Sequence, residues 1–123
     1  MNNIPISTQW TLDATGEVGR SSVNSVYMII CPATGSKGSG FLIDNGLIVT
    51  NEHVITGCST NQIFAISAYG QKIPISQKWI DSDRDLAVLR PAITQTGGLS
   101  IVKDNDLKVG ESVTTWGYPL GYN

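Results

Sequence analysis

Apolar residues occur along the chain in short runs that are separated by polar and glycine-rich segments. The longest uninterrupted runs hold about five residues, whereas a membrane-spanning helix needs about 20. Short runs that are rich in β-branched residues and bounded by turn residues are typical of strands. Because an open sheet of such strands would leave exposed edges, we expect an all-β fold in which six antiparallel strands close into a barrel. The six strands are predicted at residues 25–31, 41–43, 47–49, 62–69, 71–80 and 86–90.

The clearest local signal is a hairpin centred on Asn45-Gly46. Apolar triplets precede and follow Asp44-Asn45-Gly46, and Asn-Gly favours the two positive φ angles of a type I′ turn. Pro32 and the glycine-rich segment 35–40 predict a flexible turn before this hairpin. Pro74 has no N–H to donate, so it suggests a bulge or an edge position within the strand 71–80.

The two ends of the chain are predicted to lie outside the barrel. Residues 1–24 are polar and predict an N-terminal arm with one short strand near residues 10–12. Residues 25–110 are predicted as the barrel domain, in which the part after residue 90 is mainly connection. A last strand is predicted from Glu111 to Trp116. Of the tryptophans, Trp10 is expected to anchor the arm, and Trp79 and Trp116 to pack in or against a barrel.

The composition supports the prediction of an all-β fold and excludes some classes of binding partner. The 123 residues include 14 Ile, 9 Val and 11 Thr, which favour strands, and only 15% are charged. The net charge is −2, and the eight Lys and Arg residues are scattered singly. Nucleic acid and anionic membranes are therefore not expected as partners. The N-terminus lacks the features of a signal peptide, so the sequence as written is expected to be cytoplasmic, and extracytoplasmic only if Met1 does not begin the natural chain.

His53 and Asp85 are the residues best placed for chemistry. His53 is the single histidine and follows a predicted strand, where a short helix or loop should begin. Asp85 follows a polar turn and directly precedes a strand, so its carboxylate could accept a hydrogen bond from the imidazole and fix its tautomer. Taken separately, His53 could merely satisfy a local hydrogen bond, and Asp85 could be a solvated turn or cap residue.

Four ordered motifs together resemble the amino-terminal half of a trypsin-like serine protease, closest to the HtrA/DegP-like branch. The resemblance covers residues 25–121 and is carried by Gly-Ser-Gly-Phe-Leu-Ile, Ile-Val-Thr-Asn-Glu-His-Val-Ile, Asp-Arg-Asp-Leu-Ala-Val-Leu and Gly-Glu-Ser-Val-Thr-Thr-Trp-Gly-Tyr-Pro-Leu-Gly, which begin at residues 38, 48, 83 and 110. That family has two six-stranded barrels with the active site between them. The resemblance implies that His53 is the general base and Asp85 its orienting partner. Asp85 is preferred to Asp81 and Asp83 because it immediately precedes Leu-Ala-Val-Leu.

The resemblance also implies what the 123 residues do not supply. The family's nucleophilic serine lies in a Gly-x-Ser-Gly-Gly turn of the second barrel, and no such segment occurs here. Residues 111–123 match the first strand of that second barrel. Ser39 lies between two glycines, but it matches a structural position. The sequence is thus expected to be the first barrel of an endopeptidase that acts on a protein or peptide without a cofactor, inactive alone, and associated with a second-barrel chain or with its own copies. The alternative is a non-catalytic barrel that binds peptides or self-associates.

The two cysteines, Cys31 and Cys58, admit two readings. They are expected to be buried thiols, with a disulfide as the alternative, because many secreted members of the family have a disulfide near the catalytic histidine but place the first cysteine differently. A zinc site that joins them to Glu52 and His53 is disfavoured, because the spacing lacks paired ligands.

Overall fold

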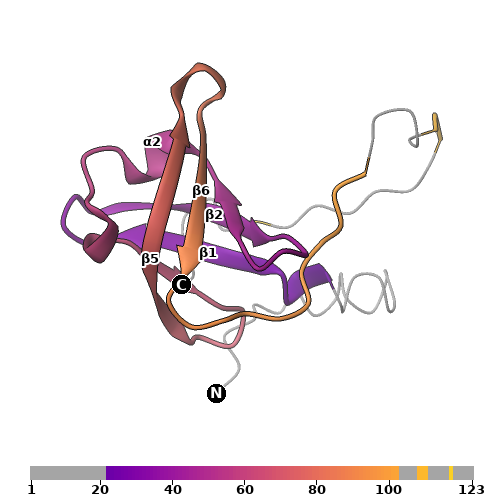
Figure 1. Cartoon of the computed structure of the whole chain (residues 1–123), viewed down its shortest axis with the longest axis horizontal. Coiled ribbons are helices and arrows are strands. Elements are labelled where there is room, and N and C mark those ends of the chain that lie inside the picture. The colour runs from indigo at the N-terminus through magenta and orange to yellow at the C-terminus, as the bar shows by residue number, and fades with distance from the viewer. Residues whose placement is uncertain (1–21, 103–107, 111–116, 118–123) are drawn as a thin grey trace.

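The computed structural model describes residues 22–102, 108–110 and 117 (Figure 1). Its strands close into one antiparallel barrel in the order β1-β2-β3-β6-β5-β4. The predicted six-stranded barrel is therefore confirmed. The strands are β1 (Val26–Cys31), β2 (Ser36–Leu42), β3 (Ile48–Thr50), β4 (Phe64–Ile66), β5 (Lys72–Asp81) and β6 (Leu86–Pro91).

The remaining regular elements are short. Helix α2 (Glu52–Ile55) follows β3, the 3₁₀ turn η1 (Thr60–Gln62) precedes β4, and η2 (Ser82–Arg84) joins β5 to β6. Figure 1 shows β5 and β6 as two arrows that lie side by side and are joined by a turn. Helix α2 packs against β1 and β2. Among the described residues, no helix is long and apolar enough to cross a membrane.

The core forms because alternate side chains of each strand point into the barrel. In β5, Ile73 and Ile75 are buried while Pro74 between them is exposed. The same alternation places Ala87 and Leu89 of β6 inside. Burial of one Ile or Leu side chain stabilises the folded state by about 1.5–3 kcal/mol relative to leaving it exposed. The largest completely buried side chains are Ile29, Leu42, Ile48, Ile55, Ile63, Ile73, Leu89 and Cys31.

The predicted hairpin joins β2 to β3, but the predicted turn type is wrong. Among the described residues, Asp85 is the one non-glycine residue with a positive φ, so Asn45 does not have the conformation of a type I′ turn. The turn instead closes through Gly46 N–H to the carbonyl of Ile43 and Ile43 N–H to the carbonyl of Leu47, with Gly46 at φ +85°. This is a three-residue loop in which a type I turn is followed by a left-handed glycine. Asn45 contributes differently, because its side chain accepts a hydrogen bond from Leu47 N–H at 3.2 Å.

The glycine-rich segment 35–40 is not a flexible turn, as its composition had suggested. All of it beyond Gly35 belongs to β2, which pairs with β1 from Ser36 opposite Cys31 to Phe41 opposite Val26. Residue 40 of this strand is a glycine because a Cβ there would be 3.0 Å from Ile29, Ile48 and the carbonyl of Val49. Close packing, and not flexibility, therefore explains this glycine.

Two further expectations on β5 each leave two alternatives open, and the structure decides between them. The register shift of the barrel lies between Ile75 and Gln77, just after Pro74, which itself pairs opposite Phe64 and is not at an edge. Trp79 is 45% exposed, so of the two alternatives it lies against the outside of the barrel and not inside it; its ring lies beside Arg90, whose guanidinium is 5.6 Å from the ring centroid. Arg90 of β6 can reach Trp79 of β5 because Trp79 pairs opposite Val88, two residues before Arg90, and both side chains are exposed.

The connection after β6 is held against the β2–β3 hairpin. Leu99 N–H donates to the carbonyl of Leu42 at 2.8 Å, and the carbonyl of Leu99 accepts from Asp44 N–H at 3.0 Å. The predicted arm strand near residues 10–12, the strand 111–116, and the placements of Trp10 and Trp116 lie outside the described residues. The domain boundaries at residues 25 and 110 stay predictions.

Candidate active site

The candidate site is formed by two segments that the barrel brings together. Strand β3 ends at Thr50, and α2 begins two residues later, so His53 lies in the first turn of a short helix at the end of a strand. Thr50 is buried, and its hydroxyl donates to the carbonyl of Ser39 at 2.7 Å, which fixes the end of β3 on β2. The second segment is the end of η2, where Asp85 precedes β6. Because β3 pairs directly with β6, the two segments lie at the same edge of the barrel.

Asp85 and His53 meet through two hydrogen bonds, although 32 residues separate them in sequence. The ring nitrogen Nδ1 of His53 is 2.7 Å from Oδ2 of Asp85, and the backbone N–H of His53 donates to Oδ1 at 2.9 Å. An ionised carboxylate only accepts hydrogen bonds, so the neutral ring carries its proton on Nδ1 and leaves Nε2 without one. The arrangement can therefore present Nε2 as a proton acceptor.

The pair lies at the surface. The side chain of His53 is 72% exposed and that of Asp85 is 48% exposed. The hydrogen bond from the His53 ring, followed by that from the His53 backbone, lowers the pKa of the Asp85 carboxyl below its ordinary value. Asp85 is thus ionised at neutral pH and available to orient the imidazole. The other two aspartates of the cluster do not take this role, since Asp81 pairs with Arg84 at 2.7 Å and Asp83 lies in the exposed 3₁₀ turn.

The backbone carbonyl of Asp85 also accepts hydrogen bonds from two residues that precede His53. Its carbonyl accepts a hydrogen bond from Nδ2 of Asn51 at 2.9 Å and from the backbone N–H of Glu52 at 3.2 Å. In addition, Ser82 Oγ donates to a carboxylate oxygen of Glu52 at 2.9 Å. Sequence reasoning missed Asn51, Glu52 and Ser82. The one available signal was an asparagine at the residue before a short helix, which ordinarily indicates only a helix cap.

A shallow, mostly apolar pocket lies next to the pair. Its volume is about 270 Å³, and it is lined by Val26, Ser39, Gly40, Phe41, Val49, Thr50, Asn51 and Leu86. Phe41 and Leu86 are 40% and 36% exposed. Ser39 lies in β2 opposite Met28, and its carbonyl accepts the hydrogen bond from the hydroxyl of Thr50 at the end of β3. The pocket therefore places exposed apolar side chains beside the residues that flank His53 and Asp85 in sequence.

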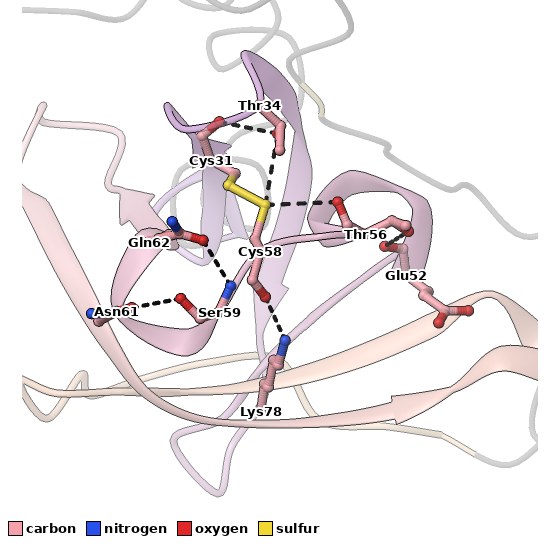
Figure 2. The surroundings of a disulfide bond; sticks show 9 residues. All are labelled: Cys31, Thr34, Glu52, Thr56, Cys58, Ser59, Asn61, Gln62 and Lys78. Carbon is pink, nitrogen blue, oxygen red and sulfur yellow. Dashed lines mark hydrogen bonds between the residues drawn. A yellow bond between two sulfur atoms is a disulfide. The ribbon is translucent and has the colours of Figure 1, made fainter.

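The cysteines form a disulfide, so the expectation of two free thiols is wrong. Cys31 at the end of β1 and Cys58 after α2 are bonded, with their Cα atoms 6.6 Å apart (Figure 2). Figure 2 also shows Lys78 of β5, whose Nζ donates to the carbonyl of Cys58 at 2.5 Å. The disulfide could not be predicted from the sequence, because its cysteines are 27 residues apart and β1 and the segment after α2 become neighbours only when the barrel closes. Among the described residues no cluster of His, Cys, Asp and Glu could hold a metal ion.

The chain is similar to known proteins over much of its length. Residues 38–123 match the family model described as trypsin-like peptidase domain. The chain is 37% identical over 90 residues to the mitochondrial serine protease HTRA2 of Drosophila grimshawi and 36% identical over the same length to that of Drosophila virilis. Each match covers 72% of this chain and 21% of the relative, so the chain spans about a fifth of the length of these relatives.

Solved structures show the same fold. A serine-to-alanine mutant of the Rv3671c protease of M. tuberculosis H37Rv, in an inactive form, has a TM-score of 0.62 at 22% identity, over 91% of this chain and 52% of that one. The active form of the Rv3671c protease has a TM-score of 0.53 at 21% identity, over 66% of this chain and 36% of that one.

Proposed function

The chain belongs to the trypsin-like peptidase family, and on that premise we propose that it supplies the general base and the orienting carboxylate of a serine endopeptidase. His53 is the base, and Asp85 holds its ring. The observation that carries the proposal is the double contact of Asp85 with the ring and the backbone of His53, at 2.7 Å and 2.9 Å. One contact fixes the tautomer and the other fixes where the ring is attached, so Nε2 points in a defined direction.

The chemistry requires a nucleophile that this base can activate. A serine hydroxyl attacks a peptide carbonyl only when a base within hydrogen-bond reach takes its proton, and the oxyanion that forms needs preorganised donors. His53 Nε2 would take that proton and later give it to the leaving amine, while Asp85 stabilises the imidazolium. No Gly-x-Ser-Gly-Gly segment occurs in the 123 residues, so the serine and the oxyanion donors are proposed to come from a second barrel. The apolar pocket with Phe41 and Leu86 gives that barrel or a bound peptide a surface to pack against.

The disulfide bears on where such an enzyme would work. Disulfides persist in oxidising compartments and are rare in reducing ones. Cys31 and Cys58 are both buried, and their bond closes a loop that contains β2, β3 and α2. We therefore place the enzyme outside the reducing cytosol, against the cytoplasmic expectation from the sequence as written.

The proposal is tested in two proteins. The 123-residue chain alone should neither cleave casein nor react with a fluorophosphonate probe. A polypeptide that continues through the second barrel should do both, and His53→Ala should lower its kcat by about 10⁴-fold or more.

Two variants separate the proposal from its rivals. Ser39→Ala should leave probe labelling of the longer polypeptide unchanged, because Ser39 is a strand residue. Labelling of Ser39 in the short chain would replace the assigned nucleophile. Undiminished activity of the His53→Ala variant would leave the barrel as a non-catalytic binding or self-association module.

A further inference from the structure

Asn51 has an unusual use for a residue at the start of a helix. It is the N-cap residue of α2, with extended backbone angles of φ −95° and ψ 146°. The side chain of an N-cap asparagine ordinarily accepts a hydrogen bond from a backbone N–H of the first helical turn. Asn51 makes no such cap bond. Its Nδ2 instead donates to the carbonyl of Asp85, 34 residues away in sequence, at 2.9 Å.

Asp85 has a left-handed conformation that its neighbours support. Its angles are φ 52° and ψ 45°, and among the described residues it is the one non-glycine residue with a positive φ. The left-handed region costs free energy for a residue with a Cβ atom, although less for aspartate than for most residues, so hydrogen bonds from neighbours help Asp85 to keep it. A return to ordinary angles would swing the carboxylate away from His53, because the side chain and the carbonyl share the same Cα.

The hydrogen bonds donated to Asp85 come from three consecutive residues, while its own backbone N–H donates to the carbonyl of Ser82 at 3.4 Å. His53 provides two donors to the carboxylate, and Glu52 N–H and Asn51 Nδ2 donate to the carbonyl. Two of these donors are backbone N–H groups, and a third is the proposed catalytic ring. Asn51 is therefore the one partner whose loss changes the support of Asp85 without touching the backbone or the His53–Asp85 pair.

We propose that Asn51 is a positioning residue. Its amide donates a hydrogen bond to the carbonyl of Asp85, which stabilises the left-handed conformation of Asp85 and so orients the carboxylate toward His53. The functional importance of this role rests on the proposed function, but the contact itself does not. The rival explanation is that Asn51 only ties two segments together. Ser82 provides the matched control, because its hydroxyl ties the same segments through Glu52 at 2.9 Å, and Ser82→Ala removes that hydroxyl but keeps the Ser82 carbonyl that accepts from Asp85 N–H.

The test uses nuclear magnetic resonance on the 123-residue chain. His53 is the single histidine, so its ring signals are unambiguous, and the tautomer can be read from the two ring nitrogens. The Nδ1–H tautomer should predominate in the native chain at neutral pH. Asn51→Ala should lose most of that population, and the pKa of the Asp85 carboxyl should rise toward its ordinary value. Ser82→Ala should leave both signals unchanged.

Asn51→Ser guards against misfolding, because serine is also favoured at an N-cap but is too short to reach Asp85. It should show the same loss as Asn51→Ala in a folded barrel. Unchanged signals in either folded variant, or an equal change in Ser82→Ala, would overturn the proposal. Unfolding of both Asn51 variants would also overturn it, since a residue that only aims Asp85 must leave the barrel intact.

Activity distinguishes this inference from the proposed function. In the polypeptide with the second barrel, Asn51→Ser should lower kcat by up to about 100-fold at little change in KM. The reason is that a displacement of the His53 ring by about 1 Å impairs proton transfer but leaves substrate binding intact. An inactive parent enzyme would count against the proposed function and would leave the resonance result standing.

Discussion

Gly38 of β2 lies directly against Val54 of α2, so closely that a Cβ atom on Gly38 would be 2.5 Å from Cγ2 of Val54. The φ angle of Gly38 is not positive, so space alone explains the glycine. Val54 is buried, and it is the residue after His53. The strand β2 therefore sets how deeply the helix that carries His53 can sit on the barrel.

Gly38→Ala should destabilise the barrel by about 1–3 kcal/mol, because the added methyl group must push α2 outward. The free energy of unfolding can be measured by urea denaturation. Combining Gly38→Ala with Val54→Ala should recover part of the loss, because the second change removes the atoms that collide. Lys37→Ala, at an exposed neighbour on the same strand, should change stability by less than about 0.5 kcal/mol. Equal effects of the Gly38 and Lys37 variants would contradict the close packing.

Asp85→Asn should abolish most activity of the polypeptide that contains the second barrel, even though it is nearly isosteric. An amide can donate to Nδ1 of His53, which moves the ring proton to Nε2 and removes the base; in a comparable triad this costs about 10⁴-fold in kcat. Asp83→Asn is the control, because Asp83 is an exposed residue of η2 two positions away. Steady-state hydrolysis of casein measures both. A larger loss for the Asp83 variant would transfer the orienting role to Asp83.

Acid should weaken the barrel partly through Asp85. Its pKa is lowered in the folded state by the hydrogen bonds from His53, so folding favours the ionised form. The resulting stabilisation is complete above the unfolded pKa of about 3.9 and is lost as the pH falls through the lower folded value. Urea midpoints between about pH 5 and pH 2 should therefore fall less steeply in Asp85→Asn than in the native chain.

The acid experiment has a built-in comparison at Asp81. Its pKa is also lowered, first by the hydrogen bond from Arg84, so Asp81→Asn should flatten the same part of the pH profile. Replacing both aspartates should flatten it further, because the two contacts use different partners. A profile that no substitution flattens would show that neither contact persists in solution.

Removal of the disulfide should cost about 3.5 kcal/mol, the loop-closure value for a bridge of this sequence separation. The bond links residues 27 positions apart and joins β1 to the segment after α2. Under non-reducing conditions the native chain should take up no alkylating reagent, and addition of dithiothreitol should lower its urea midpoint. The Cys31→Ala, Cys58→Ala double variant should start from the lower midpoint and should not respond to dithiothreitol. Alkylation of the folded native chain would contradict the bond.

The sequence by itself determined the number and order of the strands, but not the full extent of β2 and β4, and it determined which residues could do chemistry. Alternating burial, as at Ile73 and Ile75 on either side of Pro74, can be predicted from the order of apolar and other residues, because successive side chains of a strand face opposite sides. The position of the hairpin followed from the apolar triplets beside Asn45-Gly46. His53 and Asp85 could be singled out because each lies where a polar segment meets a strand, within motifs that resemble one family.

Tertiary structure decided the features that depend on how distant segments approach each other. The local sequence around Gly40 predicts a flexible turn, but Gly40 pairs with Tyr27 in β2, and the closeness of Ile29 and Ile48 leaves no room there for a Cβ atom. Asn45 keeps a negative φ although its sequence favours the opposite, because Gly46 alone supplies the left-handed residue of the three-residue loop. Local patterns record the average burial of a residue, and they do not record which neighbour fills the space beside it.

The contacts around His53 show this division most clearly. Closure of the barrel places β3 next to β6, and only then can Asp85 reach His53 across 32 residues and Asn51 reach Asp85 across 34. The same closure brings Cys58 to Cys31. Each of these contacts depends on directions and distances of a few ångströms, and those are fixed by the packing of the whole barrel and not by the residues that make the contact.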